Sequence, residues 1–311
     1  MENTKIYIIG SGAIGKALAV FLKLENKDVM LVRGSVDNLM ESSEVISVWD
    51  NKNQTFEESI TTTTFSNLKE LNGIVLITTK TFANTKIAEK LARFKGKFSI
   101  VLLQNGLNIE KPFETFENVF RCVLFTTSQI IDNGEVRFKT VTASPVGSID
   151  NVNEKLNEIV SFINTEHFTF REEPNIQHYV WNKAIINCAF NSICPLLEID
   201  NGIFYRNSEV AAIAKTIIKE CVNLSHKIGL HLDEIEIEKS LLLISERADG
   251  QLISTYDDIR KKRRTEIESL NLEMARLAES IGEPELVPFT KALGLTVLEK
   301  SKLSLLENSN R

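Results

Sequence analysis

Two patterns of hydrophobic and polar positions divide the chain. Up to about residue 170, short apolar runs alternate with segments of helical periodicity. The runs typical of buried strands cover residues 5–10, 27–32, 73–79, 97–104 and 118–126. Apolar residues at helical spacing predict helices over 13–24 and 83–94. Strands that alternate with helices are typical of a parallel sheet with helices on both of its faces.

The pattern changes near Pro174. The segments that lead up to it predict a hairpin-like pair of strands over 134–149, a helix over 151–164 and a short strand over 167–171. Beyond Pro174 the sequence predicts no strand, only a C-terminal helix and helical segments over 175–197, 208–229, 232–248 and 254–282. We therefore predict an α/β fold: a Rossmann-type doubly wound parallel sheet over 1–174, then an all-α domain over 175–311.

Composition narrows the classes of protein. Hydrophobic residues make up 43% and charged residues 25% of the 311 residues, which is typical of a folded chain. The formal net charge of −6 argues against a nucleic-acid or membrane-surface partner. No apolar run reaches the roughly 18 residues of a membrane helix, and glycines interrupt the first one, unlike a signal peptide. We expect a cytoplasmic protein.

The cysteines and histidines show no metal-binding or redox spacing. None of the cysteines forms a C-x-x-C pair, and all stand in apolar surroundings, which predicts reduced, packed thiols. The histidines lack the spacing of zinc ligands, so we expect no metal site. The residues are Cys122, Cys188, Cys194, Cys221, His167, His178, His226 and His231.

A G-x-G-x-x-G pattern stands between the first predicted strand and the first predicted helix. In a dinucleotide-binding loop, Gly10 would permit the tight turn, Gly12 would let the backbone approach a pyrophosphate, and Gly15 would let the helix pack closely. Ala13 and Ile14 complete the loop and would place helix N-terminal amides toward the phosphates. The alternative is a plain glycine-rich turn.

The end of the second predicted strand distinguishes NAD from NADP. NAD-binding proteins usually carry Asp or Glu here, hydrogen-bonded to the ribose 2′-hydroxyl, but this chain has Arg33. A guanidinium attracts a 2′-phosphate through charge-assisted hydrogen bonds, whereas a carboxylate would repel it. We therefore expect NADPH/NADP as the cofactor, the alternative being a solvated arginine.

A polar stripe follows the predicted helix 175–197. Lys183, Asn187 and Asn191 are spaced four residues apart, which places them on one helix face among apolar neighbours. This pattern predicts a lysine and two amides that project toward a substrate. A solvent-exposed polar face is the alternative. Pro195 is expected to end the helix.

A second unusual stretch covers residues 254–268. Ser254 begins an S-x-x-D pattern that would cap a helix, and Arg260–Arg264 would form a solvated helix face. Glu266 follows directly, and the local pattern does not distinguish it from its neighbours.

Two further polar residues follow predicted parallel strands. Lys80 stands in "TTKTF" and Asn105 in "QNGLN". Because ligands bind at the carboxyl ends of such strands, we expect both residues on the cofactor side. The alternatives are a surface lysine and an Asn-Gly turn.

Taken in order along the chain, these features resemble the ketopantoate reductase family. The resemblance covers nearly the whole chain, and two motifs are far more specific than the glycine loop. They are W-x-K-x-x-x-N-x-x-x-N, from Trp181, and S-x-x-x-D-x-x-x-x-R-x-T-E-I, from Ser254.

The resemblance implies an NADPH-dependent reduction of ketopantoate to pantoate, in the pathway to pantothenate and coenzyme A, in a cleft between a Rossmann and a helical domain. It implies a general acid at Lys183 and a glutamate at Glu266 that helps to bind cofactor and substrate. It also implies substrate-binding residues at Asn187, Asn191, Ser254 and Asn105, and cofactor contacts at Gly10, Gly12, Ala13, Ile14, Gly15, Arg33, Lys80 and Asn105.

The chain departs from the family pattern at several positions. Ala83 replaces the glutamine of T-K-x-x-Q, and Gln251 replaces an asparagine three residues before Ser254. Residues 192–194 replace a common P-L-T, and no glycine follows T-E-I. The reductase of another small 2-keto acid therefore stays open.

Further alternatives are a dehydrogenase of 6-phosphogluconate or of a 3-hydroxy acid, and a non-catalytic NADP(H) sensor. A sensor would not need Lys183 and Glu266. A small 2-keto acid is the expected partner, and the long C-terminal helices leave a homodimer open.

Overall fold

The computed structural model describes residues 4–131, 134–149 and 154–309. The chain forms two compact units. The sheet unit comprises the described residues up to Asn105 together with Ile109–Gln177. The helical unit comprises Gly106–Asn108 and the described residues from His178 onward.

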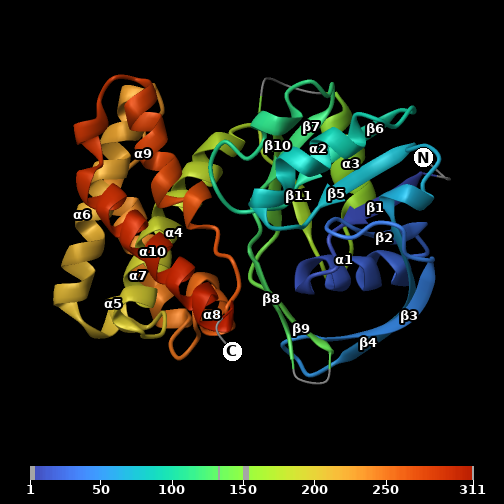
Figure 1. Ribbon diagram of the computed structural model, residues 1–311, viewed down its shortest axis with the longest axis horizontal. Coiled ribbons are helices and arrows are strands. Elements are labelled where there is room, and N and C mark those ends of the chain that lie inside the picture. The colour runs from blue at the N-terminus through green and yellow to red at the C-terminus, as the bar shows by residue number, and fades with distance from the viewer. Residues whose placement is uncertain (1–3, 132–133, 150–153, 310–311) are drawn as a thin grey trace. The chain divides into compact units, whose positions relative to one another are not determined.

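Within the described residues, eleven strands of the sheet unit form one sheet in the order β11-β10-β7-β6-β5-β1-β2-β4-β3-β9-β8 (Figure 1). The strands are β1 (Lys5–Ile9), β2 (Val29–Arg33), β3 (Ser42–Trp49), β4 (Thr55–Thr64), β5 (Gly73–Ile77), β6 (Phe98–Leu102), β7 (Val119–Cys122), β8 (Thr126–Ile130), β9 (Val136–Thr140), β10 (Ser144–Ser148) and β11 (Phe170–Glu172). The predicted α/β fold class is confirmed, although the sheet is mixed rather than wholly parallel.

The centre of the sheet is parallel and buried on both faces. β1 pairs in parallel with β2 and β5, so that Ile8 lies opposite both Leu31 and Leu76. β6 and β7 extend the parallel sheet beyond β5. Consequently the carboxyl ends of these strands lie along one edge, where the polar residues that follow them are placed.

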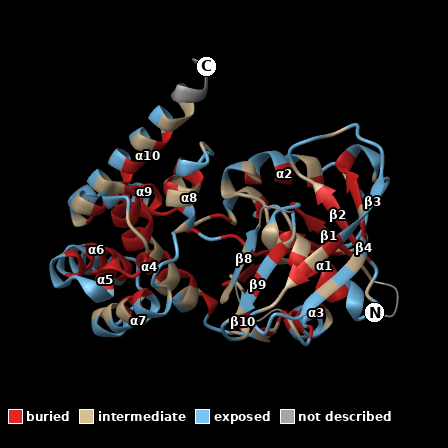
Figure 2. Ribbon diagram, turned by 90° about the horizontal axis from the view of Figure 1, so that it is seen from below, coloured by how far each residue is buried: buried red, intermediate tan, exposed pale blue. Residues whose placement is uncertain are grey.

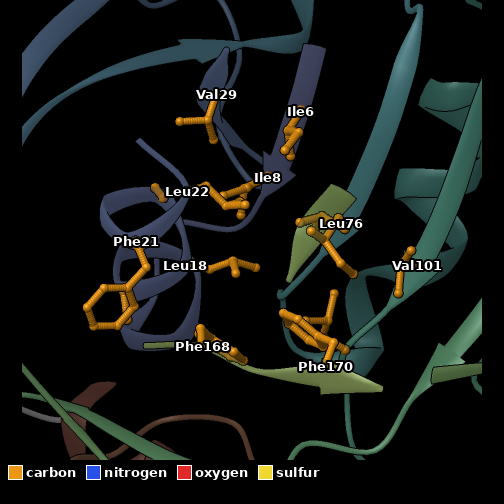
Figure 3. Packing of buried hydrophobic residues seen from close by; sticks show 14 of the residues in the cluster. Ile6, Ile8, Leu18, Phe21, Leu22, Val29, Leu76, Val101, Phe168 and Phe170 are labelled. Atoms are coloured by element: carbon orange, nitrogen blue, oxygen red, sulfur yellow. The ribbon is translucent and has the colours of Figure 1, made fainter. Parts of the chain in front are cut away.

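Alternate residues of the central strands enter two different cores. Ile6 and Ile8 pack with Leu18 of helix α1 (Ala13–Leu24) (Figure 3). Helix α3 (Lys155–Ile163) contributes residues to the same core. Tyr7 and Ile9 pack on the opposite face with helix α2 (Asn84–Leu91). This period of two produces the helix-covered sheet that the sequence predicts. Residues 151–153 of the predicted helix 151–164 lie outside the described residues.

One hairpin of the sheet was not predicted from the sequence, and one predicted hairpin does not form. β3 and β4 pair antiparallel with Ile46 opposite Glu58, in a segment with no predicted strand. The predicted hairpin over 134–149 is wrong, because β9 pairs with β8 and β3, whereas β10 pairs with β7 and β11. β8 lies at the edge of the sheet and is largely exposed, unlike β1 (Figure 2).

Over 178–309, the helical unit contains helices and turns and no strand (Figure 1). Its helices are α4 (Ile176–Leu197, which begins in the sheet unit), α5 (Ile203–Arg206), α6 (Ser208–Lys227), α7 (Glu234–Arg247), α8 (Ser254–Arg260), α9 (Asn271–Ser280) and α10 (Pro288–Ser309). Of the helices in the described ranges, none combines the length and hydropathy required to cross a membrane.

Two local predictions in the helical unit are wrong. Pro195 does not end α4, which continues to Leu197. Proline lacks one backbone donor, and within the last turn that loss leaves the rest of the helix intact. The segment 254–282 is not one helix: α8 ends at Arg260, Lys262 takes a positive φ of 53°, and a 3-10 helix over Ile267–Ser269 precedes α9. The basic run therefore begins at the last residue of α8 and continues through the turn that follows, rather than forming a helix face.

Candidate active site

The glycine loop joins β1 to α1 at the carboxyl edge of the sheet. Gly10 adopts a φ of +122°, which L-residues rarely take, and a Cβ there would lie 2.7 Å from Thr78 Oγ1. Among the described residues, no side chain caps the N-terminus of α1, and its first turn carries no acidic residue. The backbone amides of this turn are therefore suited to a phosphate group.

Gly12 and Gly15 meet different surroundings. A Cβ on Gly15 would collide with the backbone oxygen of Gly10, whereas a Cβ on Gly12 would have no atom within 4 Å. The close approach at Gly15 packs the helix against the loop, and the open space at Gly12 is the kind that a pyrophosphate needs. Ala13 and Ile14 form the first residues of α1 between them.

These surroundings predict that alanine substitutions will separate stability from binding. Gly15→Ala should destabilise the sheet unit by about 1–3 kcal/mol, because the collision overpacks the loop. Gly12→Ala should leave the melting temperature unchanged, because its methyl group meets no protein atom. It should weaken NADPH binding by at least about tenfold, because the methyl group would occupy the space expected for the charged pyrophosphate and displace it from its hydrogen bonds. Thermal unfolding and fluorescence titration measure the two effects. Equal melting temperatures for the two variants would contradict the packing role of Gly15.

The residues after β5 support the loop. Thr78 Oγ1 lies 3.2 Å from the carbonyl oxygen of Ile9 and 3.0 Å from that of Gly10, to which it donates. Lys80 is half-buried and directly precedes the 3-10 helix Thr81–Ala83. Thr78, which the sequence analysis missed, thus fixes the glycine loop, while Lys80 follows two residues later at the same strand end.

A buried amide pair holds the segment after β6. Asn84 and Gln104 exchange hydrogen bonds of 2.6 and 3.0 Å through their side chains. Gln104 also donates to the carbonyl of Thr79 at 2.8 Å, and Asn84 donates to the carbonyl of Ile109 at 2.9 Å. The pair therefore fixes both ends of the segment that contains Asn105, which is itself exposed.

An ion pair anchors the return of this segment to the sheet unit. Arg121 of β7 donates to Glu110 at 2.8 Å and is only 2% exposed. Burial lowers the pKa of Arg121, and the carboxylate of Glu110 opposes that shift. Truncation of Glu110 would leave the buried Arg121 charge without this partner, so we assign the pair to support of the loop.

Arg33 is the last residue of β2 and lies beside the same edge. It is half-buried and stands opposite Thr64 of β4 in the sheet register. Gly34 follows it, and a Cβ at Gly34 would lie 3.1 Å from a side-chain carbon of Thr79 and 3.6 Å from one of Ile9. The chain after Arg33 thus passes close to the ends of β1 and β5.

The predicted polar stripe is built on α4 in the helical unit. Asn191 is 3% exposed, and its side-chain nitrogen donates to the carbonyl of Asn187 at 2.9 Å. Ser254 Oγ lies 3.5 Å from Asn191 Oδ1, so α8 contributes a hydroxyl to the same group. Lys183 and Asn187 are both half-buried, with Lys183 one turn before Asn187. The structure therefore brings the side chains of Asn191 and Ser254 together, next to the backbone carbonyl of Asn187.

Ser254 does not cap α8, contrary to one reading of its S-x-x-D pattern. Ile253 occupies the N-cap position, and Ser254 is the first helical residue. Its hydroxyl instead faces the amide of Asn191.

Glu266 lies in the turn between α8 and α9. It is half-buried, and its carbonyl accepts hydrogen bonds from the amide of Ser269 at 3.0 Å and from its hydroxyl at 2.9 Å. Within the same unit, the amide of Leu107 donates to the carbonyl of Ser269 at 3.0 Å. The segment 106–108, next to Asn105 in sequence, is thereby tied to the turn that carries Glu266.

The cysteines near the stripe are not candidate nucleophiles. All four cysteines are free and buried. Burial, aided by Asp200, raises the pKa of Cys194 to about 12, and burial likewise raises the pKa of Cys188. Both thiols therefore stay protonated at neutral pH. Within the described residues, no group of three or more His, Cys, Asp or Glu side chains could hold a metal ion.

Comparison with known proteins assigns the chain. The family description "Ketopantoate reductase PanE/ApbA" matches residues 6–151, and its C-terminal counterpart matches residues 175–294. The chain belongs to the ketopantoate reductase family. It is therefore an NAD(P)-dependent oxidoreductase, and the resemblance found in the sequence is confirmed.

Similar proteins in this family include two named 2-dehydropantoate 2-reductase. The one from Streptococcus pyogenes serotype M3 is 25% identical over 284 residues, which cover 89% of this chain and 92% of that protein. The one from Pyrococcus horikoshii is 26% identical over 280 residues, which cover 88% and 91%.

Solved structures show the same fold as this ketopantoate reductase family member. A dimeric ketopantoate reductase from Staphylococcus aureus has a TM-score of 0.80 at 18% identity, covering 96% of this chain and 99% of that one. A D-mandelate dehydrogenase with NADH and anilino(oxo)acetate has a TM-score of 0.82 at 19% identity, covering 97% and 99%.

Proposed function

We propose that this enzyme reduces 2-dehydropantoate to pantoate with NADPH, in the pathway to pantothenate and coenzyme A. The observation that carries the proposal is the polar stripe of Lys183, Asn187 and Asn191 on the largely buried helix α4, with the Ser254 hydroxyl of α8 beside Asn191. The relatives named 2-dehydropantoate 2-reductase along most of the chain support it.

In this proposal the two units supply different parts of the reaction. Residues 1–174 bind NADP(H), through Gly10, Gly12, Ala13, Ile14 and Gly15 at the pyrophosphate. Lys80 and Asn105 contribute further cofactor contacts. Asn105 and Glu266 each contact both the cofactor and the substrate. Residues 175–311 form the substrate and catalytic domain. The uncapped N-terminus of α1 and the open space at Gly12 fit a dinucleotide.

The side chains of the helical unit suit acid catalysis at a carbonyl. When bound, the nicotinamide supplies the hydride that reduces the C2 carbonyl. Negative charge then develops on the carbonyl oxygen, where the Lys183 ammonium stabilises it and donates the proton that forms the hydroxyl. Asn187, Asn191 and Ser254 bind substrate oxygens without adding net charge, and Glu266 orients the substrate.

NADPH is the proposed form of the cofactor because Arg33 ends β2. A guanidinium at this position attracts a 2′-phosphate, and a carboxylate in its place would favour NADH. The D-mandelate dehydrogenase structure contains NADH, and titration of this enzyme with both dinucleotides distinguishes the two preferences.

A different 2-keto acid is the second candidate substrate. Gln251 stands where the family pattern has asparagine, one methylene shorter, in the exposed turn before α8. Its carbonyl accepts a hydrogen bond of 2.8 Å from the amide of Asn201, which fixes the backbone there. A longer amide near Ser254 would change the fit around a substrate side chain.

A substrate panel tests the proposed function. Purified enzyme is assayed with NADPH and with NADH against ketopantoate, phenylglyoxylate, pyruvate and 2-ketoisovalerate, by loss of reduced-nicotinamide absorbance. We expect ketopantoate with NADPH to give the highest kcat/KM, by at least about tenfold, since one missing contact typically costs that much. A higher value for another acid would establish the second candidate, and tight NADPH binding without turnover would indicate a sensor.

The dimeric Staphylococcus aureus relative supports a homodimer as the assembly of this enzyme.

A further inference from the structure

The loop that follows Arg33 contains a carboxylate that is held by a lysine of another element. Lys90 of α2 places its Nζ 2.6 Å from Asp37 Oδ2, and the same ammonium donates to the carbonyl of Gly34 at 3.3 Å. The side chains of Lys90 and Asp37 are 23% and 31% exposed, so this ion pair is partly shielded from water. One ammonium therefore connects both ends of residues 34–37.

Neighbouring residues hold the same loop in place. The amide of Ser66 donates to Asp37 Oδ1 at 3.4 Å, and the amide of Asn38 donates to Ser66 Oγ at 3.0 Å. Lys90 Nζ also lies 4.9 Å from the centre of the Phe65 ring, within the range of a cation–π interaction. The lysine is thus fixed by a carboxylate, a carbonyl and a ring.

The position of this ion pair bears on the choice of cofactor. The end of β2 is where a free carboxylate favours NADH and disfavours the 2′-phosphate of NADPH. Asp37 lies four residues after Arg33, on a loop whose first residue packs against the ends of β1 and β5. Unless it is neutralised, its charge opposes that of Arg33.

We propose that Lys90 is a positioning residue that determines the preference for a 2′-phosphate. It neutralises Asp37 and holds the carbonyl of Gly34, so that Arg33 acts on the cofactor without a competing carboxylate. The inference rests on the proposed use of NADPH. It adds a residue on a helix face, far in sequence from the end of β2, to the specificity of the cofactor site.

The test measures the affinity for two adenosine fragments that differ in the 2′-phosphate. Isothermal titration of the full-length protein with 2′,5′-ADP and with 5′-AMP is carried out on the wild type, Lys90→Met and Lys90→Met/Asp37→Asn. Lys86→Met serves as the control, because Lys86 is exposed one turn earlier on α2. Melting temperatures are recorded for each variant.

We expect Lys90→Met to weaken the binding of 2′,5′-ADP by about tenfold or more, since it leaves the negative charge of Asp37 without its lysine near the 2′-phosphate. Its affinity for 5′-AMP should change by less than about twofold, as should both affinities of Lys86→Met. Adding Asp37→Asn should restore most of the affinity for 2′,5′-ADP.

The opposite results overturn the inference in distinguishable ways. Equal losses for both fragments without rescue by Asp37→Asn would mean that Lys90 only supports the fold. Unchanged affinity for 2′,5′-ADP in Lys90→Met would show that Asp37 does not compete with Arg33. A wild type that binds 2′,5′-ADP no more tightly than 5′-AMP would overturn the NADPH proposal itself, and this inference with it.

Discussion

Replacement of Lys183 by methionine is expected to lower kcat for ketopantoate by about 10³-fold, the range of a positioned general acid. The charge that develops on the C2 oxygen would lose its ammonium partner, and no side chain at residue 183 would donate the proton. Methionine is unbranched and apolar and is one atom shorter than lysine, so it replaces the stem of lysine and α4 should keep its packing. Steady-state kinetics with saturating NADPH measure the effect.

The control for this variant is the charge-matched Lys219→Met on α6, where the lysine is exposed. It should keep the wild-type kcat. Lys183→Met should also bind NADPH within about twofold of the wild type, because the proposed cofactor contacts lie on other residues. A kcat within about tenfold of the wild type in Lys183→Met would show that another group donates the proton.

The parallel core of the sheet unit was predictable because its signals are local. Buried strands read as short apolar runs, and the glycine loop joins the first of them to an amphipathic helix. The hairpin of β3 and β4 lacked such a signal: the first four residues of β3 are exposed, and β4 is rich in threonine and glutamate. A strand without an apolar run cannot be predicted from the pattern of hydrophobic residues.

Strand pairing was harder to predict than strand position. β9 and β10 are adjacent short strands, which is typical of a hairpin, yet each pairs with strands elsewhere. The choice of partner depends on the whole sheet. Its central strands lie between β9 and β10, so the chain after Thr140 passes to the other side of the sheet before β10 begins.

The candidate site shows the same division. The stripe from Lys183 to Asn191 could be predicted from helical spacing alone. The hydrogen bond from Asn191 to the carbonyl of Asn187 also lies within one helix. The support from Asn84 and Gln104 did not emerge, because residues 20 positions apart meet only through the sheet. Likewise, nothing in the sequence near Glu266 indicates that its turn is tied to Leu107.

Arg33→Asp is expected to weaken NADPH binding by about 100-fold or more, because a charge-assisted hydrogen bond is lost and a like charge faces the 2′-phosphate. The affinity for NADH should fall by less than about threefold, since the ribose of NADH carries a 2′-hydroxyl that can donate a hydrogen bond to the new carboxylate. Arg33 ends β2 and is half-buried there, so the substitution alters the strand end rather than the core. Fluorescence titration with each dinucleotide measures the two dissociation constants.

The matched control for cofactor preference is Arg93→Asp, which makes the same change in net charge at an exposed residue just after α2. Both dinucleotides should bind it as tightly as the wild type, because exposed charges at a distance are screened by salt. An equal loss of NADPH and NADH in Arg33→Asp would mean that the arginine contacts the adenine or supports the strand. Preference would then have to come from other residues near the end of β2. A selective loss of NADPH, absent from Arg93→Asp, would place the 2′-phosphate at Arg33.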